Sequence, residues 1–173
     1  MFRDIVIPKN NETEFIEIAA KLGIRKLYFL YEFDDYNNDS VNKKLGLVND
    51  HKDINVEIGL IVNQKSLSKA SKSSKLLVIK SSEHDRFFIE SKKVKLIYGF
   101  EEASRKDYMQ QRASGLNHVL CELINKNNVV IGFSYDSILS VPQTITSTII
   151  GRMMQNINLC KKYRCNFVIS SFS

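Results

Sequence analysis

The sequence predicts an α/β protein with a parallel sheet, on three observations. Short β-rich apolar runs alternate with amphipathic helical stretches along the 173 residues. Some runs are continuously apolar, such as LLVI at 76–79, which is typical of strands covered by helices. Seven such strand candidates are separated by the crossover connections that parallel neighbours need. Either a (β/α) barrel or an open doubly wound sheet satisfies this pattern.

The predicted strands follow one another through the whole chain. They cover Asp4–Pro8, Lys26–Tyr31, Ile54–Val62, Lys75–Lys80, Val94–Phe100, Val129–Ser134 and Asn166–Ser170. A complete eight-unit barrel usually takes about 250 residues, so we expect one domain over residues 1–173 and a barrel that is short or incomplete. The unpaired strand edges left by a missing eighth unit would favour pairing with another chain.

Three helices are predicted from caps and apolar stripes. In the first, Asn11 precedes Glu14 by three residues in a capping-box arrangement, and Gly23 ends the helix. The second begins near Ser114. The third is long and follows Pro142, which is tolerated in a first helical turn. Its apolar face consists of Ile145, Ile149, Met153, Ile157 and Cys160.

Composition narrows the class of protein. No apolar run approaches the roughly 18 residues of a membrane span, and the first residues lack the features of a signal peptide. The cytoplasm is therefore the expected compartment. The three cysteines contain no C-x-x-C pair, which indicates neither a disulfide framework nor a zinc knuckle. We expect Cys121 and Cys160 to be small core residues.

The net charge of +6 is unevenly distributed. From Arg105 onward there are eight basic and three acidic residues, giving +5, whereas residues 1–104 carry the remaining +1. A basic half beside a nearly neutral half is what a polyanion-binding surface would produce.

Residues for independent catalysis are sparse. The three histidines, His51, His84 and His118, stand apart from one another and form no metal-binding spacing. Glycine-rich phosphate loops and a G-x-S-x-G nucleophile elbow are missing from the sequence. Ser134 and Ser170 end predicted strands, where barrel active sites lie, but no histidine is placed to activate either. We therefore expect no catalytic site and no bound metal or cofactor in this chain.

Residues 105–120, RKDYMQQRASGLNHVL, carry the strongest functional signal. Basic and amide side chains gather here around a predicted helix N-terminus, whose free N–H groups favour phosphate. Arg112 can bind phosphate bidentately, and Gln111 and Asn117 can contact sugar or base edges. In the alternative interpretation, Ser114 only caps the helix and the charges are solvated.

The same stretch carries a family resemblance. QRASGLNHVL at 111–120 and NKNNVVIGFS at 125–134 resemble the barrel-type protein subunit of archaeal and eukaryotic ribonuclease P, known as protein component 3. ESKKVKLIY at 90–98, RMMQNINLCKKY at 152–163 and NFVISS at 166–171 look like further parts of that family in the same order. The resemblance extends from about residue 83 to the end of the chain.

The resemblance implies a (β/α) TIM-like barrel of the PHP-like type, without the histidine-rich metal site of PHP phosphoesterases. With about seven β/α units in this sequence, the barrel would be short or incomplete. It implies a noncatalytic subunit that supports ribonuclease P RNA in removing the 5′ leader of precursor tRNA. Its partners would be that RNA, a small α/β protein subunit, other ribonuclease P proteins and, indirectly, precursor tRNA. Magnesium ions would be bound by the RNA, and no membrane would be involved.

Two departures from the family matter. Members usually continue past the last strand with another helix and strand, so the resemblance leaves the closure of the barrel open. They also commonly carry histidine and asparagine where this sequence has Gln110, Gln111 and Ala113. The residues expected to bind RNA are Arg105, Lys106, Gln111, Arg112 and Asn117, with Arg152, Lys161, Lys162 and Arg164 as a second basic group.

Two other functions remain as alternatives. The first is a divergent PHP-like metal-dependent phosphoesterase that uses carboxylates with His84 or His118. The second is a protein-interaction module whose basic side chains are merely solvated.

Overall fold

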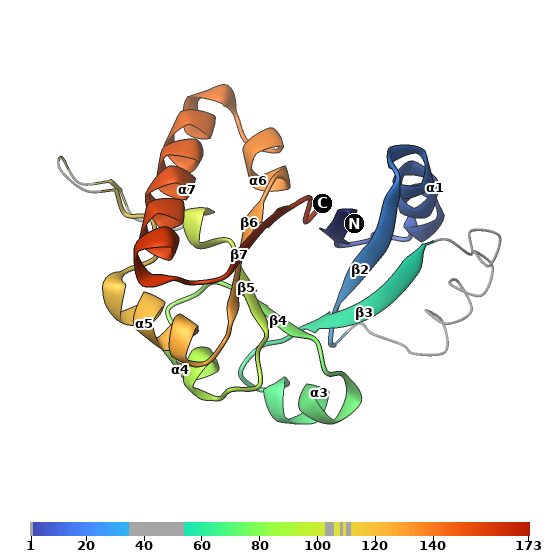
Figure 1. Ribbon diagram of the computed structural model, residues 1–173, viewed down its shortest axis with the longest axis horizontal. Coiled ribbons are helices and arrows are strands. Elements are labelled where there is room, and N and C mark those ends of the chain that lie inside the picture. The colour runs from blue at the N-terminus through green and yellow to red at the C-terminus, as the bar shows by residue number, and fades with distance from the viewer. Residues whose placement is uncertain (1, 35–53, 103–105, 108, 110–111) are drawn as a thin grey trace.

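Seven parallel strands form one sheet whose spatial order, β1 to β7, is also the order along the chain. The computed structural model describes residues 2–34, 54–102, 106–107, 109 and 112–173. The strands are β1 Phe2–Val6, β2 Ile24–Glu32, β3 Asn55–Ile61, β4 Leu77–Lys80, β5 Leu96–Tyr98, β6 Val130–Ser134 and β7 Phe167–Ser170. Each falls on a predicted strand, and the sheet curves into a ring in Figure 1.

The ring of strands is nearly closed by the chain that follows β7. The amide of Phe172 donates to the carbonyl of Ile5 over 2.8 Å, and the amide of Ile7 donates to the carbonyl of Ser173 over 2.8 Å. The two ends therefore lie side by side, as Figure 1 also shows. The expectation of an unpaired edge at this point is only partly correct, because residues 172–173 bond to Ile5 and Ile7 while β1 and β7 themselves are not paired in the described sheet.

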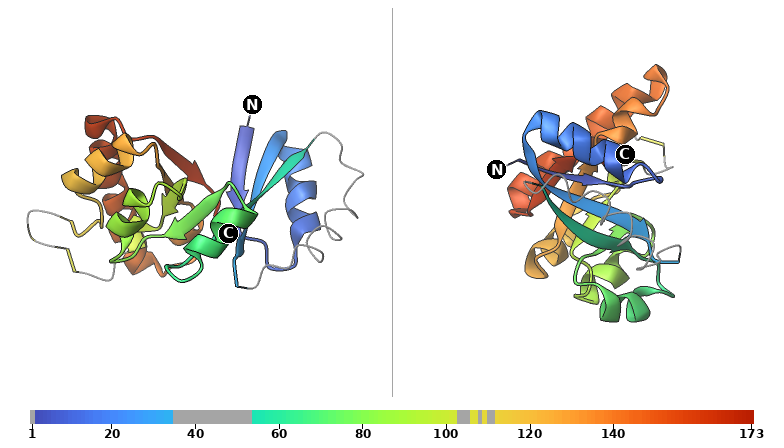
Figure 2. Two further views of the ribbon diagram at one scale, coloured as in Figure 1. Left: turned by 90° about the horizontal axis from the view of Figure 1, so that it is seen from below. Right: turned by 90° about the vertical axis from the view of Figure 1, so that its right-hand side faces the viewer.

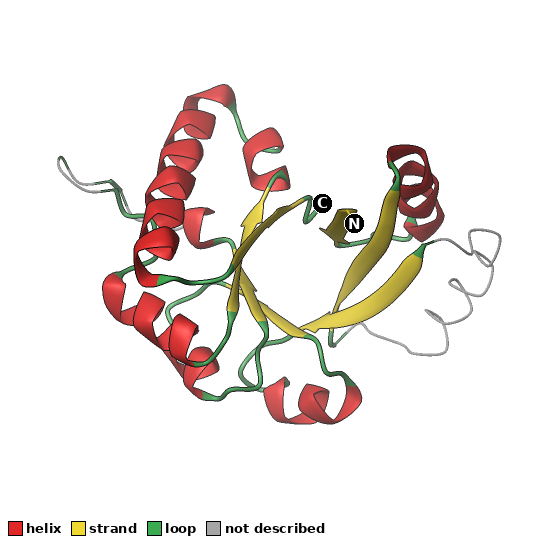
Figure 3. Cartoon of the chain, viewed as in Figure 1, coloured by secondary structure: helices red, strands yellow, loops and turns green. Residues whose placement is uncertain are grey.

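Helices cover the outside of the ring (Figures 1 and 3). They are α1 Glu12–Leu22, α3 Leu67–Ser73, α4 Asp85–Glu90, the 3-10 turn η1 Phe100–Glu102, α5 His118–Lys126, α6 Asp136–Leu139 and α7 Gln143–Tyr163. Figure 2 places α1 on one flank of the barrel and α5 and α7 on the opposite flank. Within the described ranges, no helix is both long enough and apolar enough to span a bilayer.

Alternation along the strands separates the apolar core inside the ring from the apolar cores beneath the helices. One side of each strand faces the barrel interior, which is filled by Ile5, Leu30, Ile61, Val78, Leu96, Tyr98 and Phe172. The other side faces the helices, where Leu77, Ile79, Ile97, Ile131 and Phe133 pack on α4, α5 and α7. Strands with apolar residues on both sides are what buried parallel sheets require, so the continuous apolar runs were a sound guide to the fold.

The predicted caps are only partly correct. Gly23 ends α1 in the left-handed conformation, with φ 69°, as expected. Asn11 precedes α1 but makes no capping bond; its side-chain oxygen accepts from the amide of Lys9 instead. Cys121 and Cys160 are buried, as predicted, and so is Cys165.

Candidate RNA-binding site

The described residues between η1 and α5, which are 106–107, 109 and 112–117, lie at the carboxyl end of the barrel strands, and we call them the connection. Of the predicted contacts, Lys106, Arg112 and Asn117 are exposed. Arg105 and Gln111 lie outside the described residues. The connection therefore presents basic and amide side chains to solvent, as an RNA-binding segment must.

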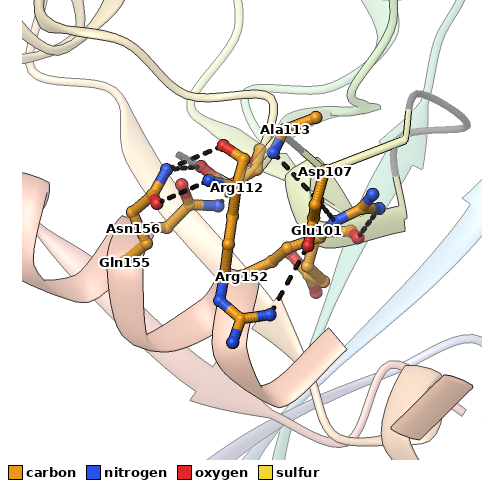
Figure 4. A network of polar contacts seen from close by, with 8 residues as sticks. Glu101, Asp107, Arg112, Ala113, Arg152, Gln155 and Asn156 are labelled. Atoms are coloured by element: carbon orange, nitrogen blue, oxygen red, sulfur yellow. Dashed lines mark hydrogen bonds and ion pairs between the residues drawn. The ribbon is translucent and has the colours of Figure 1, made fainter. Parts of the chain in front are cut away.

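Helix α7 holds this connection through paired hydrogen bonds (Figure 4). The Gln155 side chain accepts from the Arg112 amide at 3.3 Å and donates to the Arg112 carbonyl at 3.0 Å. It also donates to the Ser114 hydroxyl at 2.8 Å. The next residue of α7, the buried Asn156, donates from its side chain to the Ser114 carbonyl at 2.8 Å. The side chains of α7 thus supply hydrogen-bond partners for backbone groups of Arg112 and Ser114, which lie outside helices and strands.

The S-G-L-N motif of residues 114–117 is a structural connection. Ser114 is buried, and Gly115 has φ 80° with its Cα close to the Phe100 carbonyl, so a Cβ there would lie 2.6 Å from that oxygen. Leu116 enters the helix-facing core. Asn117 caps α5, because its side-chain oxygen accepts from the Leu120 amide at 2.9 Å. The prediction that the helix begins near Ser114 is therefore wrong by about one turn.

Arg152 is turned into the protein. Only 8% of its side chain is exposed, and its Nε lies 2.9 Å from Oδ1 of Asp107. Its Nη1 donates to the Glu101 carbonyl at 3.1 Å. The sequence placed Arg152 among the RNA-binding residues, but in this structure its guanidinium anchors the connection to α7. A contact between Arg152 and RNA stays a prediction, and the burial of the guanidinium argues against it.

The Asp107 carboxylate interacts with two arginines and with one backbone amide of the connection. It accepts from the Ala113 amide at 2.9 Å and lies 3.4 Å from Nη1 of Arg112. Burial alone would raise the pKa of the Asp107 carboxyl, but the Ala113 amide and the Arg152 guanidinium together lower it. Asp107 therefore stays ionised and holds Arg112, with 46% of the arginine side chain still exposed.

Arg112 lies directly over a glycine of α7. A Cβ built on Gly151 would be 2.3 Å from Cζ of Arg112, which is far below a van der Waals contact. A glycine inside a helix costs about 1 kcal/mol relative to alanine. A glycine at 151 leaves space for the Arg112 guanidinium, which any larger side chain would displace.

Beside the connection, the mouth of the barrel holds a cavity of about 910 Å³ between η1, α6 and α7. Its charged lining is mixed: four carboxylates (Glu101, Glu102, Asp107 and Asp136) face three cations (Lys80, Lys106 and Arg152). Lys80 and Glu102 neutralise each other at 2.6 Å. The mouth is therefore slightly acidic, which does not suit a phosphate-rich ligand.

Glu101 is the most unusual group in this lining. It is fully buried, and Oε1 accepts from the Ser134 amide at 3.3 Å and the Ser137 hydroxyl at 3.4 Å. Oε2 has no partner within the described part of the chain. Burial raises the pKa of Glu101 to about 6. No three histidine, cysteine, aspartate or glutamate side chains of the described residues gather in a way that could hold a metal ion.

Of the second predicted basic group, Arg152 lies at the connection and the other three residues lie at the other end of the barrel. Lys161, Lys162 and Arg164 are exposed where α7 ends and β7 begins. The described residues of the connection contact the middle of α7, at Arg152, Gln155 and Asn156. The two basic groups are thus separated along the barrel axis. They do not form one continuous surface.

The sequence contained a signal for the inward position of Arg152 and Asn156. Ile149, Met153 and Cys160 are buried on α7, and the same helical spacing passes through 152 and 156. A polar residue in an apolar stripe indicates a buried hydrogen-bonding group more than a ligand contact.

Comparison with known proteins gives a structural relationship without a sequence family. No protein-family profile matches the chain, and no curated protein matches it in sequence. A chain in the cryo-EM structure of archaeal ribonuclease P with mature tRNA superimposes with a TM-score of 0.81 at 19% sequence identity, over 99% of this chain and 74% of that one. The barrel seen here is therefore also the fold of a chain in that ribonucleoprotein.

Proposed function

We propose that this chain is a noncatalytic RNA-binding protein subunit of ribonuclease P, supporting the catalytic RNA in removing the 5′ leader of precursor tRNA. The observation that carries the proposal is the superposition over 99% of the chain on a chain of archaeal ribonuclease P. The sequence resemblance of residues 83–173 to protein component 3 points to the same assembly.

The chemistry of the site is consistent with a supporting role. Lys106, Arg112 and Asn117 are exposed on a connection that α7 holds by side-chain bonds, so they are presented without a large ordering cost on binding. Exposed guanidinium and ammonium groups bind phosphate and compete with solution cations. Cleavage would then be the work of magnesium ions on the RNA. A small α/β subunit and the other ribonuclease P proteins would be the protein partners.

Reconstitution tests the proposal. Precursor-tRNA cleavage by an archaeal ribonuclease P RNA is measured with its small α/β partner subunit, with and without this chain, over a magnesium titration. We expect the chain to lower the magnesium requirement or to increase the rate. Arg112→Gln should remove most of the gain, while Arg86→Gln, the same change on the exposed face of α4, should retain it. No effect of the wild-type chain beside a folded partner subunit would reject the assignment.

The same preparation tests the phosphoesterase alternative. Its metal content is measured by mass spectrometry, and hydrolysis of a phosphodiester probe is followed without RNA in added manganese. Stoichiometric metal with hydrolysis that Glu101→Gln abolishes would favour the enzyme over the subunit.

A further inference from the structure

The chain enters four successive strands through turns that are rich in basic residues. Taken together with the last residues of α3, α5 and α7, these turns are residues 72–76, 91–95, 126–129 and 161–166, which precede β4, β5, β6 and β7. They contain nine lysines and arginines and no acidic residue. All nine are exposed: Lys72, Lys75, Lys92, Lys93, Lys95, Lys126, Lys161, Lys162 and Arg164. We call these side chains the basic face.

The four turns lie on one face of the molecule. In a parallel barrel every helix-to-strand connection is at the amino ends of the strands. Backbone bonds join neighbours: the Lys95 amide donates to the Leu77 carbonyl, and the Lys95 carbonyl accepts from Val130, each at 2.9 Å. Asn125 donates from its side chain to the Tyr163 carbonyl at 2.8 Å, which brings the ends of α5 and α7 together.

The charge of this face is not neutralised. Within the described residues none of the nine cations forms an ion pair with a carboxylate. The acidic residue nearest to them in sequence is Glu90, at the end of α4, and it pairs with Arg86 on its own helix. The opposite end of the barrel has the mixed lining described above, so the molecule is polarised along its axis.

Helix stability alone does not account for the pattern. Cations favour the last turn of a helix through its dipole, but that effect fades beyond the end of the helix. Lys75, Lys93 and Lys95 lie beyond the ends of α3 and α4. Lys92 and Arg164 have φ 59° and 55°, a conformation that glycine or asparagine adopts more easily. Two cations thus occupy positions where local backbone preference favours another residue.

We propose that the basic face binds the phosphate backbone of RNA, and that it forms a larger RNA contact than the connection at residues 106–117. This inference rests on the proposed ribonuclease P function and assigns the contact to a face. Adjacent helices pack 8–10 Å apart, so four turns span roughly 30 Å, enough for several consecutive phosphates. Serine and asparagine are interleaved with the cations and supply donors for phosphate and 2′-hydroxyl groups.

The face lacks the features of a membrane-binding surface. The apolar residues of the turns, Leu76, Val94 and Val129, are buried or half-buried. Surfaces that lie on lipid combine cations with exposed apolar side chains that enter the acyl region. Here the exposed residues are charged or polar. The ring of Tyr163 is half-buried, and the Lys162 ammonium lies 5.5 Å from its centroid.

Matched charge removal tests the inference. One variant carries Lys93→Gln, Lys95→Gln and Lys162→Gln on the basic face. The control carries Lys9→Gln, Lys65→Gln and Lys69→Gln, three exposed lysines outside it. Binding to labelled ribonuclease P RNA is measured by fluorescence anisotropy from 50 to 300 mM salt, and circular dichroism verifies that both variants are folded.

We expect the basic-face variant to bind about tenfold or more weakly at low salt, with the slope of log affinity against log salt reduced by about 2. The control should keep the wild-type slope. Equal losses in the two variants would reduce the effect to net charge and overturn the inference. Wild-type binding by the basic-face variant would overturn it too, and would identify a protein interface if capture of the small α/β subunit were lost. Failure of the inference is distinguished from failure of the proposed function by the reconstitution assay. If the wild-type chain still stimulates cleavage, the proposed function stands although the basic face is not the RNA contact.

Discussion

Arg152 on α7 donates from Nε to Oδ1 of Asp107 over 2.9 Å, and this ion pair joins the longest helix to the connection that precedes α5. The pair lies where the connection leaves η1, since Arg152 also bonds the Glu101 carbonyl. One largely buried guanidinium thus fixes two backbone segments and one carboxylate.

We expect Arg152→Ala to lower the free energy of unfolding by about 2 kcal/mol, because Asp107 loses a partner while only 22% of its side chain is exposed. Asp107→Asn should cost less, since the Ala113 amide keeps an acceptor. Urea unfolding of both variants and the double variant measures a coupling energy, expected to be about 1 kcal/mol. Strict additivity would show that the pair contributes nothing to the fold.

The buried Glu101 predicts a pH dependence of stability. Its pKa is about 6 in the folded chain and 4.5 ordinarily, so the folded state holds the proton more tightly than the unfolded state. The stabilisation is complete below pH 4.5 and is lost as the pH rises through 6. Glu101→Gln should therefore be more stable than wild type by about 2 kcal/mol at pH 8 and nearly equal to it at pH 4.5. Parallel unfolding free energies across that range would contradict the burial of an ionisable carboxyl.

Asn117 can be tested as a helix cap and as an RNA contact separately. Asn117→Ala removes the acceptor for the Leu120 amide and should cost about 1 kcal/mol in unfolding free energy. Asn117→Asp keeps the acceptor and places a negative charge at the helix N-terminus, so stability should be retained. If Asn117 faces RNA, the aspartate variant should nevertheless bind RNA more weakly. Asn11→Ala is the control, because Asn11 makes no capping bond.

Gly151→Ala should separate the position of Arg112 from the stability of α7. Alanine favours the helix by about 1 kcal/mol, yet its Cβ would occupy the place of the Arg112 guanidinium. We therefore expect a melting temperature no lower than that of wild type, together with a loss of cleavage stimulation similar to that of Arg112→Gln. Full stimulation by a stable Gly151→Ala chain would show that the placement of Arg112 over α7 has no functional role.

The strands were predictable because burial on both faces leaves a continuous apolar signal, seen most clearly at 76–79. The start of α5 was not, because serine and asparagine are both good cap residues and both occur in S-G-L-N. Which of the two caps the helix depends on α7, some forty residues away in the sequence. There Gln155 donates to the Ser114 hydroxyl and Asn156 donates to the Ser114 carbonyl.

Closure of the barrel could not be predicted from the number of strands. It depends on two backbone bonds from residues beyond the last predicted strand and on how the interior is filled. The polarity of the molecule was also hidden, because the charge count by halves mixed residues from both ends of the barrel. Grouping the same lysines by the turns that precede each strand would have revealed the basic face, once parallel strands were assumed.

The aromatic pair at the closure gives the last prediction. Phe172 stacks on Tyr98 with ring centroids 4.8 Å apart. The Phe172 ring fits because position 132 is a glycine, since a Cβ there would lie 2.7 Å from the ring. Phe172→Ala empties the interior where β1 meets the end of β7, so the free energy of unfolding should fall by about 3–5 kcal/mol. Phe172→Leu should lose less than half as much.

Hydrogen exchange distinguishes loss of closure from general destabilisation. In Phe172→Leu the amide of Ile7, bonded to the Ser173 carbonyl, should exchange by local opening, while the amide of Ile131, bonded to Asn166 between β6 and β7, should exchange only with global unfolding. If the two amides keep the relation they have in the wild-type chain, the aromatic stack fills space without holding the first and last strands together. If only Ile7 becomes faster, the stack is what keeps a ring of seven strands closed.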